Sequence, residues 1–168
     1  MKKILTLLTI AFALVALSSC HKDDDNSVQE WREKNEKAYV DSIQNGGYLP
    51  IEGIAGMPLG VYYKVLPGSE DKGAVHPLQT SKVRVLYQGR FYNGTVFDGG
   101  SSLTGDNPIQ FSISNTIRGF QIALQQMVVG NHWRICIPWA LGYRDTANGS
   151  IPAYSTLIFD VTLVEIIE

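Results

Sequence analysis

The chain has 168 residues, of which 14 are Lys or Arg and 16 are Asp or Glu, and its formal net charge is −2 at pH 7. No basic block is present, and removing the two lysines near the start leaves a mildly acidic protein. This charge balance argues against binding to a phosphate backbone, so we expect no nucleic-acid partner. The length after residue 20 suits one domain with one core and a short N-terminal appendage.

The first twenty residues have the three parts of a bacterial secretion signal. Two lysines follow Met1, an apolar stretch runs from Ile4 to Leu17, and small residues lead to Cys20. The stretch is too short to span a bilayer, which takes about 20 residues. Its ending resembles a lipobox, so we expect residues 1–19 to be a signal peptide and Cys20 to become a lipid-modified N-terminus. The alternative is ordinary secretion with Cys20 unmodified.

Residues 20–26 are expected to form an acidic linker. The run at 21–25 resembles the acidic export signal of some surface lipoproteins, and a solvated linker is an equal alternative. Acyl chains on Cys20 would hold the protein on a membrane without crossing it, because each buried methylene contributes roughly 0.8 kcal/mol. The expected location is therefore the bacterial cell envelope, lipid-anchored at the outer membrane and facing either the periplasm or the exterior.

Residues 27–58 are expected to form an N-terminal helix and a connector. Ser27 and Glu30 have the spacing of a capping box, and apolar residues then recur at helical spacing until Asn45-Gly46-Gly47. The helix could be a spacer, a dimerisation element or a helix that docks on its own domain, and docking is the simplest reading. Tyr48 to Pro58 mixes Gly and Pro and is expected to be the connector.

A strand from Leu59 to Leu66, a turn at 67–69 and a polar loop at 70–79 are expected next. The run from Val83 to Asp98 then predicts a hairpin. Alternate residues of its first half, including Val83 and Tyr87, share an apolar face, and Asn93-Gly94 tolerates the positive φ of a tight turn. The returning strand would bring Phe97 and Asp98 close to Tyr87.

The rest of the chain predicts three further strands and one short helix. Ser114 and Asn115 are candidate N-caps of this helix, and Gly130 is placed to end it. The strands are expected at Ile109–Ile113, His132–Ile137 and Ser155–Glu165, with a long loop from Pro138 to Tyr154. Together they predict an α+β domain at residues 59–168.

Conventional catalytic sets are lacking. His21, His76 and His132 are widely scattered, so neither a metal site nor a nucleophile–base pair is expected, and no cofactor is predicted. With Cys20 lipidated, Cys136 has no partner for an internal disulfide, and its apolar surroundings favour a small buried hydrophobe.

A series of motifs gives this domain a family resemblance. In chain order these are Val85-Leu86-Tyr87-Gln88-Gly89, Asn93-Gly94-Thr95-Val96-Phe97-Asp98, Pro108-Ile109-Gln110-Phe111, Ile117-Arg118-Gly119-Phe120, Met127-Val128-Val129-Gly130, Ile137-Pro138 and Ile151-Pro152-Ala153-Tyr154-Ser155-Thr156-Leu157-Ile158-Phe159-Asp160-Val161. The succession resembles the FK506-binding-protein (FKBP)-type peptidyl-prolyl cis-trans isomerases. The resemblance implies a bent antiparallel sheet wrapped around one short helix, with a ligand pocket between them.

The resemblance also implies the site. Matching positions for the reaction are Tyr87, Phe97, Asp98, Phe120 and Phe159, and matching substrate-binding positions are Ile109, Phe111, Ile117 and Leu141. Phe120 would form the pocket floor, where the family often has Trp, and the backbone N–H of Ile117 would bind a substrate carbonyl. The carboxylate of Asp98 would accept hydrogen bonds and would not act as a nucleophile. Phe111 is read equally well as a core residue.

The implied partners are proline-containing polypeptides, with macrolides as ligands of the same pocket, and the implied chemistry needs no covalent step. The barrier of an X–Pro bond, roughly 18–20 kcal/mol, comes from amide resonance, and a dry pocket that binds the twisted amide more tightly than the planar one lowers it. One departure concerns the hydroxyl that would bind a substrate carbonyl: Leu141 stands where the family usually has Tyr. This predicts weakened activity and leaves open a binding module or chaperone with little activity, or a purely structural lipoprotein.

Overall fold

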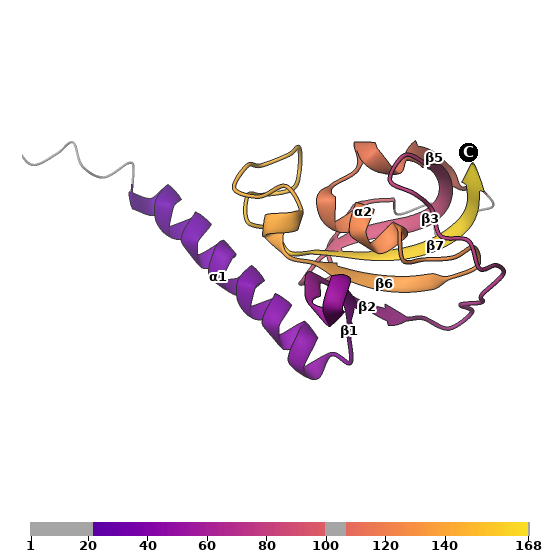
Figure 1. Ribbon diagram of the computed structural model, residues 1–168. Coiled ribbons are helices and arrows are strands. Elements are labelled where there is room, and N and C mark those ends of the chain that lie inside the picture. The colour runs from indigo at the N-terminus through magenta and orange to yellow at the C-terminus, as the bar shows by residue number, and fades with distance from the viewer. Residues whose placement is uncertain (1–21, 100–106, 168) are drawn as a thin grey trace, which may run out of the picture.

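The computed structural model describes residues 22–99 and 107–167, which form one curved antiparallel sheet with two helices (Figure 1). The predicted signal peptide and Cys20 lie outside these residues. The strands are β1 (Leu49–Glu52), β2 (Pro58–Val65), β3 (Lys82–Phe91), β4 (Val96–Asp98), β5 (Ile109–Ser112), β6 (His132–Ile137) and β7 (Leu157–Ile167). The helices are α1 (Lys22–Asn45) and α2 (Arg118–Leu124), with 3-10 turns at Ile54–Gly56, Ile113–Asn115 and Trp139–Leu141.

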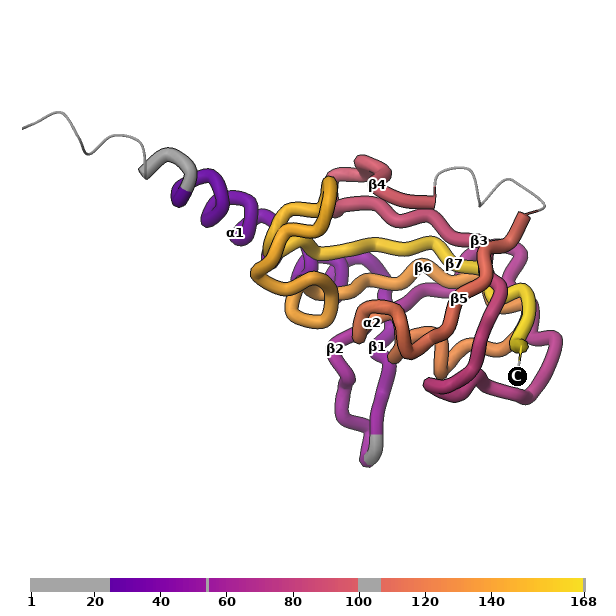
Figure 2. Tube along the Cα trace, turned by 90° about the horizontal axis from the view of Figure 1, so that it is seen from above, coloured from indigo at the N-terminus to yellow at the C-terminus, as the bar shows by residue number. Residues whose placement is uncertain are grey.

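The sheet has the order β1-β2-β6-β7-β3-β4, with β5 also paired to β3, and every pairing is antiparallel. Its spine is the long pair β3–β7, whose register runs from Lys82 opposite Ile167 to Phe91 opposite Leu157. An irregularity between Arg84 and Val85 interrupts this register, and such bulges bend a strand. The strands curve around α2, which lies across one face (Figure 2). The predicted α+β fold, a bent sheet around a short helix, is confirmed.

The core lies between α2 and the concave face of the sheet. Every residue of α2 from Gly119 to Leu124 is buried, against strand residues such as Val85, Ile135 and Leu163 that have no exposed surface. The helix sits so close to β6 that a Cβ at Gly119 would lie 2.3 Å from Cγ2 of Ile137. Only glycine permits this approach, which sets the distance between helix and sheet.

The opposite face of the sheet carries a buried charge cluster. Asp160 in β7 is 5% exposed and accepts two hydrogen bonds from Arg134, at 2.6 and 2.8 Å, and one from Arg90 at 2.9 Å. The three residues come from neighbouring strands. Arg134 of β6 pairs in register with Asp160, and on the other side Asp160 pairs with Gln88 of β3, two residues before Arg90. The cluster therefore joins β6, β7 and β3 on their outer face.

Helix α1 docks on its own domain. Asn35 is fully buried, and its Oδ1 accepts from the backbone N–H of Thr156 at 2.8 Å while its carbonyl accepts from the Thr156 hydroxyl at 3.0 Å. Trp31 donates to Ser155 Oγ at 3.2 Å, and Tyr39 donates to the carbonyl of Gly60 at 2.8 Å. Of the three roles considered for this helix, docking is the one that the structure shows.

The beginning of α1 differs from the expectation. The helix starts at Lys22, so Ser27 lies inside it instead of capping it, and the linker expected at 20–26 is helical from residue 22. A helix N-terminus favours acidic residues through its dipole, so an acidic run before Ser27 is compatible with an earlier start. The capping-box spacing of Ser27 and Glu30 therefore does not mark the start of this helix.

Three further boundaries differ. The expected connector contains β1, which pairs with β2 to form a hairpin. Ser114 and Asn115 belong to a 3-10 turn, and the residue preceding α2 is Ile117, whose side chain makes no capping bond. The helix ends with Gln125 as its C-cap, and Gly130 instead turns the chain into β6 with φ +94°. For β1 the pairing with β2 decides the boundary, which the local pattern does not report.

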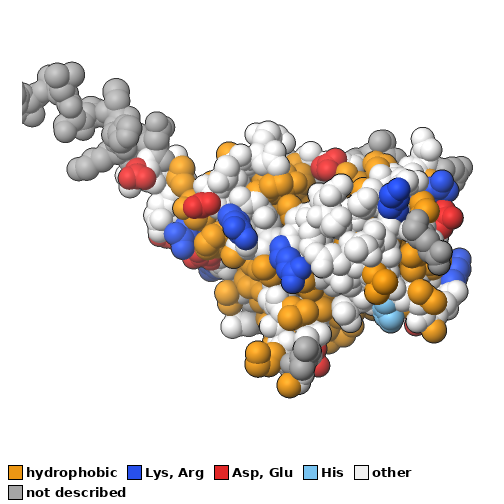
Figure 3. Space-filling view, turned by 45° about the horizontal axis from the view of Figure 1, so that its top comes forward, with side chains coloured by type: hydrophobic (Ala, Val, Ile, Leu, Met, Phe, Trp, Pro, Cys, Tyr) orange, Lys and Arg blue, Asp and Glu red, His pale blue; other side chains and the backbone are white. Residues whose placement is uncertain are grey.

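The surface of the described residues is polar along α1 and apolar at one projecting end. Lys34 with Glu30 and Lys37 with Asp41 form ion pairs along the exposed side of the helix. Apolar side chains gather at the end of the β1–β2 hairpin, where Met57 is 68% exposed (Figure 3). No helix in the described part of the chain is long and apolar enough to cross a membrane.

Candidate active site

The β3–β4 hairpin brings together the residues predicted for one side of the site. Asp98 pairs with Gly89 in register, and the hydroxyl of Tyr87 donates to Asp98 Oδ2 at 2.8 Å. Gly89 has no side chain, and a Cβ there would lie 2.7 Å from the ring of Phe97 and 2.8 Å from that of Phe159. The glycine thus lets two aromatic rings close over the strand.

Aromatic rings from four elements converge next to this hairpin. Phe159 of β7 is central, with ring-centroid distances of 5.1 Å to Phe120, 5.6 Å to Phe97 and 6.3 Å to Tyr87. Tyr87 also lies 6.3 Å from Phe120, edge to face. Phe120 and Phe159 are buried, whereas Tyr87 and Phe97 keep part of their surface exposed. The five residues predicted for the reaction therefore form one cluster whose base is buried and whose outer members reach the surface.

The N-terminal end of α2 forms the adjoining side. Ile117 precedes the helix in extended conformation, and its carbonyl accepts from the N–H groups of Phe120 and Gln121. Its own N–H has no acceptor among the described residues. The Gln121 side chain donates to the carbonyls of Ser114 and Thr116, at 3.2 and 2.7 Å, and so fixes the turn before the helix. This arrangement leaves the Ile117 N–H available to a ligand carbonyl.

The two predicted residues of β5 have different surroundings. Phe111 is half-buried and lies 5.8 Å from Phe120 and 6.4 Å from Tyr87, ring centroid to ring centroid. Phe111 is therefore both part of the aromatic cluster and packed against the core, so its position is compatible with both interpretations, a site residue and a core residue. Ile109 pairs with Val85 of β3 in register and is 41% exposed.

The structure changes the view of Leu141. This residue ends a 3-10 turn and packs toward β2, with its Cδ1 3.4 Å from where a Cβ of Gly60 would stand. Two residues later, Tyr143 is half-buried and close enough to Asp98 for the carboxylate to raise its pKa. The assignment of Leu141 to substrate binding stays a prediction, and Tyr143 is a second candidate at this end of the site.

Burial determines the state of both tyrosines beside Asp98. Desolvation raises the pKa of Tyr87 far above its ordinary value, with further contributions from the hydrogen bond to Asp98 and from its charge. Desolvation likewise raises the pKa of Tyr143, and the charge of Asp98 adds to it. Because the ionised form of each phenol is disfavoured, both remain hydrogen-bond donors at neutral pH.

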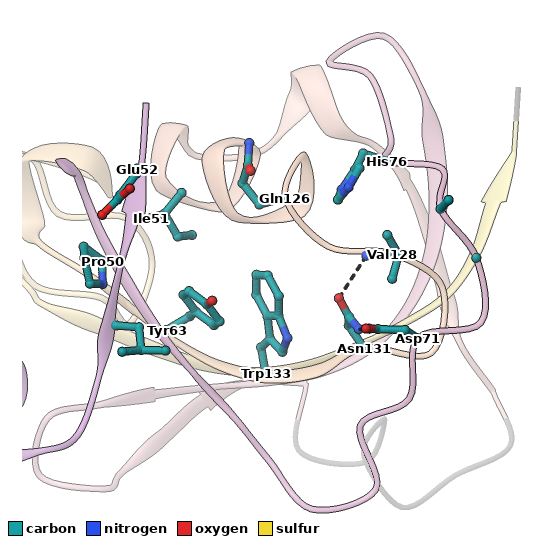
Figure 4. A pocket seen from close by; sticks show the side chains of 13 residues that line it. Pro50, Ile51, Glu52, Tyr63, Asp71, His76, Gln126, Val128, Asn131 and Trp133 are labelled. Carbon is teal, nitrogen blue, oxygen red and sulfur yellow. Dashed lines mark hydrogen bonds between the residues drawn. The ribbon is translucent and has the colours of Figure 1, made fainter. Parts of the chain in front are cut away.

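A separate hollow of about 730 Å³ lies between the β1–β2 hairpin and the segment after α2 (Figure 4). Trp133 and Tyr63 form its floor, with their rings stacked at 4.1 Å, and Asp71, His76 and Asn131 lie at one end. None of the residues predicted for the site lines this hollow.

Among the described residues, the aromatic cluster is not accompanied by groups suited to covalent or metal chemistry. No group of three or more His, Cys, Asp or Glu that could hold a metal ion occurs within residues 22–99 and 107–167. The thiol of Cys136 is fully buried on β6, and burial raises its pKa to about 12. The arrangement instead offers an apolar aromatic surface, two tyrosine hydroxyls, a carboxylate and a free backbone N–H. Such a surface suits non-covalent binding of a ring with a neighbouring carbonyl.

Comparisons with known proteins agree with this geometry. Residues 73–164 match the family model described as FKBP-type peptidyl-prolyl cis-trans isomerase. The chain is 39% identical over 117 residues to the FKBP-type 22 kDa peptidyl-prolyl cis-trans isomerase of Escherichia coli, and 32% identical over 140 residues to the outer membrane protein MIP of Legionella longbeachae. These matches cover 69% and 80% of this chain but 54% and 58% of the relatives, so the chain spans little more than half their length.

Solved structures share the fold at lower sequence identity. FkpA from Escherichia coli superposes with a TM-score of 0.69 at 23% identity, covering 86% of this chain and 63% of that one. A peptidyl-prolyl cis-trans isomerase from Pseudomonas syringae superposes with a TM-score of 0.67 at 22% identity, covering 84% and 96%. The family model spans all five residues of the cluster, Asp98 included, and on this evidence the chain belongs to the FKBP-type peptidyl-prolyl cis-trans isomerase family.

Proposed function

We propose that the protein is a peptidyl-prolyl cis-trans isomerase that accelerates X–Pro isomerisation in exported proteins without a covalent step. The observation that carries this proposal is the cluster of Tyr87, Phe97, Phe120 and Phe159 against the Tyr87–Asp98 pair. An apolar aromatic surface favours the twisted amide, which has lost resonance and is less dipolar than the planar form. Differential binding of this form lowers the barrier without a general base or a metal.

Each group of the cluster has a role in this proposal. Phe120 lies under the proline ring, while Phe97, Phe159 and Tyr87 surround it. The N–H of Ile117 and the hydroxyl of Tyr143 donate to carbonyl oxygens of the substrate on either side of the ring. Asp98 accepts from Tyr87 and keeps its ring in place. Ile109 and Phe111 extend the apolar surface along β5, and Leu141 supports the loop from below instead of touching the substrate.

The alternative of a binding module or chaperone with little activity had rested partly on a missing hydroxyl. We propose that Tyr143, whose pKa is raised by burial and by the charge of Asp98, supplies this hydroxyl, which would weaken that reason. Proline-containing polypeptides remain the proposed substrates, and macrolides the proposed competing ligands of the same site.

A protease-coupled assay with a short peptide containing an apolar residue before proline tests the activity. We expect the full chain to accelerate isomerisation, and the Phe97→Ala and Asp98→Ala variants to lose most of the effect while remaining folded by circular dichroism. Val96→Ala is the matched control, because Val96 lies on the same strand with 45% of its surface exposed. A wild-type rate equal to the uncatalysed rate would overturn the proposed activity. Full activity in both Phe97→Ala and Asp98→Ala would overturn the proposed site.

We also propose that the protein is anchored in the bacterial cell envelope by acyl chains on Cys20. The lipobox-like ending of the first segment supports this location, and so does the similarity to a relative named an outer membrane protein. Cells expressing the protein would incorporate a labelled fatty acid into it, and the Cys20→Ala variant would not. Label retained in that variant would refute lipidation at Cys20. Protease shaving of intact cells would then separate surface from periplasmic exposure.

A further inference from the structure

We propose that Trp31, on helix α1, is a positioning residue for the isomerase site, and that it acts by holding Phe91 and through it Phe97. The inference rests on the proposed function of the aromatic cluster. It assigns a role in that site to a residue outside the matched family segment, residues 73–164.

Phe97 has little backbone support of its own. It lies in the middle of β4, a strand of three residues at one edge of the sheet, whose pairing with β3 is irregular between Gly89 and Arg90. Its ring contacts two others, with centroid distances of 5.6 Å to Phe159 and 4.9 Å to Phe91. The orientation of Phe97 therefore depends on where Phe91 stands.

Phe91 in turn depends on α1. Its side chain is only 8% exposed, and the ring of Trp31 meets it edge to face at 5.7 Å. Trp31 also contacts Tyr92, the next residue of the hairpin, at 5.6 Å. A hollow of about 270 Å³ between α1 and the loop at Pro152 and Ala153 is also lined by Trp31. Without the indole, Phe91 would face an enlarged hollow and lose its second ring contact, so its own position would no longer be fixed.

Trp31 is itself fixed at both ends. Its Nε1 donates to the hydroxyl of Ser155 at 3.2 Å, and that hydroxyl donates to the carbonyl of Pro152 at 2.7 Å. One helical turn later, buried Asn35 fastens the helix to Thr156. The indole is thus held from α1 and from the segment that precedes β7. The rings of Trp31, Phe91, Phe97 and Phe159 form a continuous series of contacts from the docked helix to the site.

The helix offers a matched control in Tyr39, which docks the same helix elsewhere. Its hydroxyl donates to Gly60, and its ring meets Tyr62 of β2 at 6.0 Å, so it contacts neither Phe91 nor the cluster rings by any ring contact between described residues. Replacing Tyr39 by Ala loosens the docking of α1 but leaves Trp31 and the ring series intact.

The experiment compares three variants of the full chain: Trp31→Ala, Trp31→Phe and Tyr39→Ala. We expect Trp31→Ala to lower kcat/KM in the coupled assay about two- to tenfold, the size of the effect of one aromatic pair. Trp31→Phe should restore most of it, because an aromatic ring again meets Phe91, and Tyr39→Ala should stay close to wild type. Equal losses in Trp31→Ala and Tyr39→Ala would mean that helix docking alone matters, and would overturn the proposal.

A second readout does not require activity. With 4-fluorophenylalanine introduced at position 97, the ¹⁹F resonance should shift or broaden in Trp31→Ala and remain near its wild-type position in Tyr39→Ala. An unchanged resonance in Trp31→Ala would refute the positioning role even in an active enzyme. If the wild-type chain shows no isomerase activity but the resonance still changes in Trp31→Ala, the positioning of Phe97 is upheld while the proposed function fails.

Discussion

The hydroxyl of Tyr87 donates to Oδ2 of Asp98 across the β3–β4 hairpin at 2.8 Å, and this bond joins a half-buried phenol to an exposed carboxylate. It closes one side of the aromatic cluster, because Tyr87 also lies about equally far from Phe120 and Phe159, at 6.3 Å in both cases. The bond thus sets the orientation of a ring that the proposed substrate would touch.

Tyr87→Phe tests this bond while keeping the ring. The expected loss in kcat/KM is about two- to tenfold, since a hydrogen bond of this kind contributes about 0.5–1.5 kcal/mol net. The free energy of unfolding, measured in urea, should change by less, because an exposed carboxylate regains water as a partner. Unchanged kcat/KM would show that Asp98 does not act through Tyr87.

The raised pKa of Tyr87 predicts a pH dependence of stability at high pH. Because its pKa is higher in the folded than in the unfolded protein, protonated Tyr87 adds stability that is complete below the unfolded pKa, about 10. The contribution disappears as the pH rises from there through the folded pKa. The urea midpoint of the wild type should therefore fall above about pH 10. It should fall less steeply in Tyr87→Phe, and parallel curves for the two proteins would contradict the shift.

A pair of variants separates the roles of Tyr143 and Leu141. Tyr143→Phe should lower kcat/KM several-fold with little loss of stability, because it removes a hydroxyl beside Asp98 and keeps the ring. Leu141→Ala should leave kcat/KM nearly unchanged and lower the free energy of unfolding. The expected loss is about 1–3 kcal/mol and not more, because the side chain is only partly buried. Coupled assays and urea denaturation of both variants decide the assignment, and the opposite pattern would restore Leu141 to the site.

Local patterns predicted the α+β class and the β3–β4 hairpin, whereas the bent sheet around a helix and the remaining site positions followed from the resemblance to the FKBP-type family. Alternation in β3 and the Asn93-Gly94 turn are sufficient to bring Tyr87 and Asp98 together, and the structure has both. The start of α1 and strand β1 could not be predicted, because β1 exists through its pairing with β2 and the helix start depends on no single residue.

Tyr143 shows a different limit of the sequence. The loop between β6 and β7 contains no periodicity, so nothing local says whether residue 141 or 143 faces Asp98. Two structural observations favour residue 143: Leu141 packs over Gly60, where β2 has no side chain, and the charge of Asp98 contributes to the raised pKa of Tyr143. The contact between Trp31 and Phe91 could not be predicted either, because the two residues are 60 positions apart and a single sequence contains no covariation between them.

Cys136 provides a probe of the docking of α1. The thiol has no exposed surface, burial raises its pKa to about 12, and the hydroxyl of Ser42 in α1 lies beside it. We expect iodoacetamide at pH 8 to leave it unmodified in the native protein and to alkylate it after unfolding in urea, because the thiolate is the reactive form. Asn35→Ala, which removes the buried amide that fastens the helix to Thr156, should speed the native reaction. Rapid alkylation of the wild type would contradict a docked helix.

The charge cluster on the outer face predicts a large difference between two carboxylates that both pair with arginine. Asp160 is 5% exposed and accepts from Arg134 and Arg90, whereas Glu165 pairs with Arg84 at 2.9 Å with half of its side chain exposed. Asp160→Ala leaves two partly buried guanidinium groups without their anion, so the free energy of unfolding should fall by about 3–5 kcal/mol. Glu165→Ala should cost no more than about 1 kcal/mol, because its pair is exposed to solvent. Urea denaturation of both variants measures the difference. Comparable losses would mean that the cluster adds nothing beyond an ordinary surface pair.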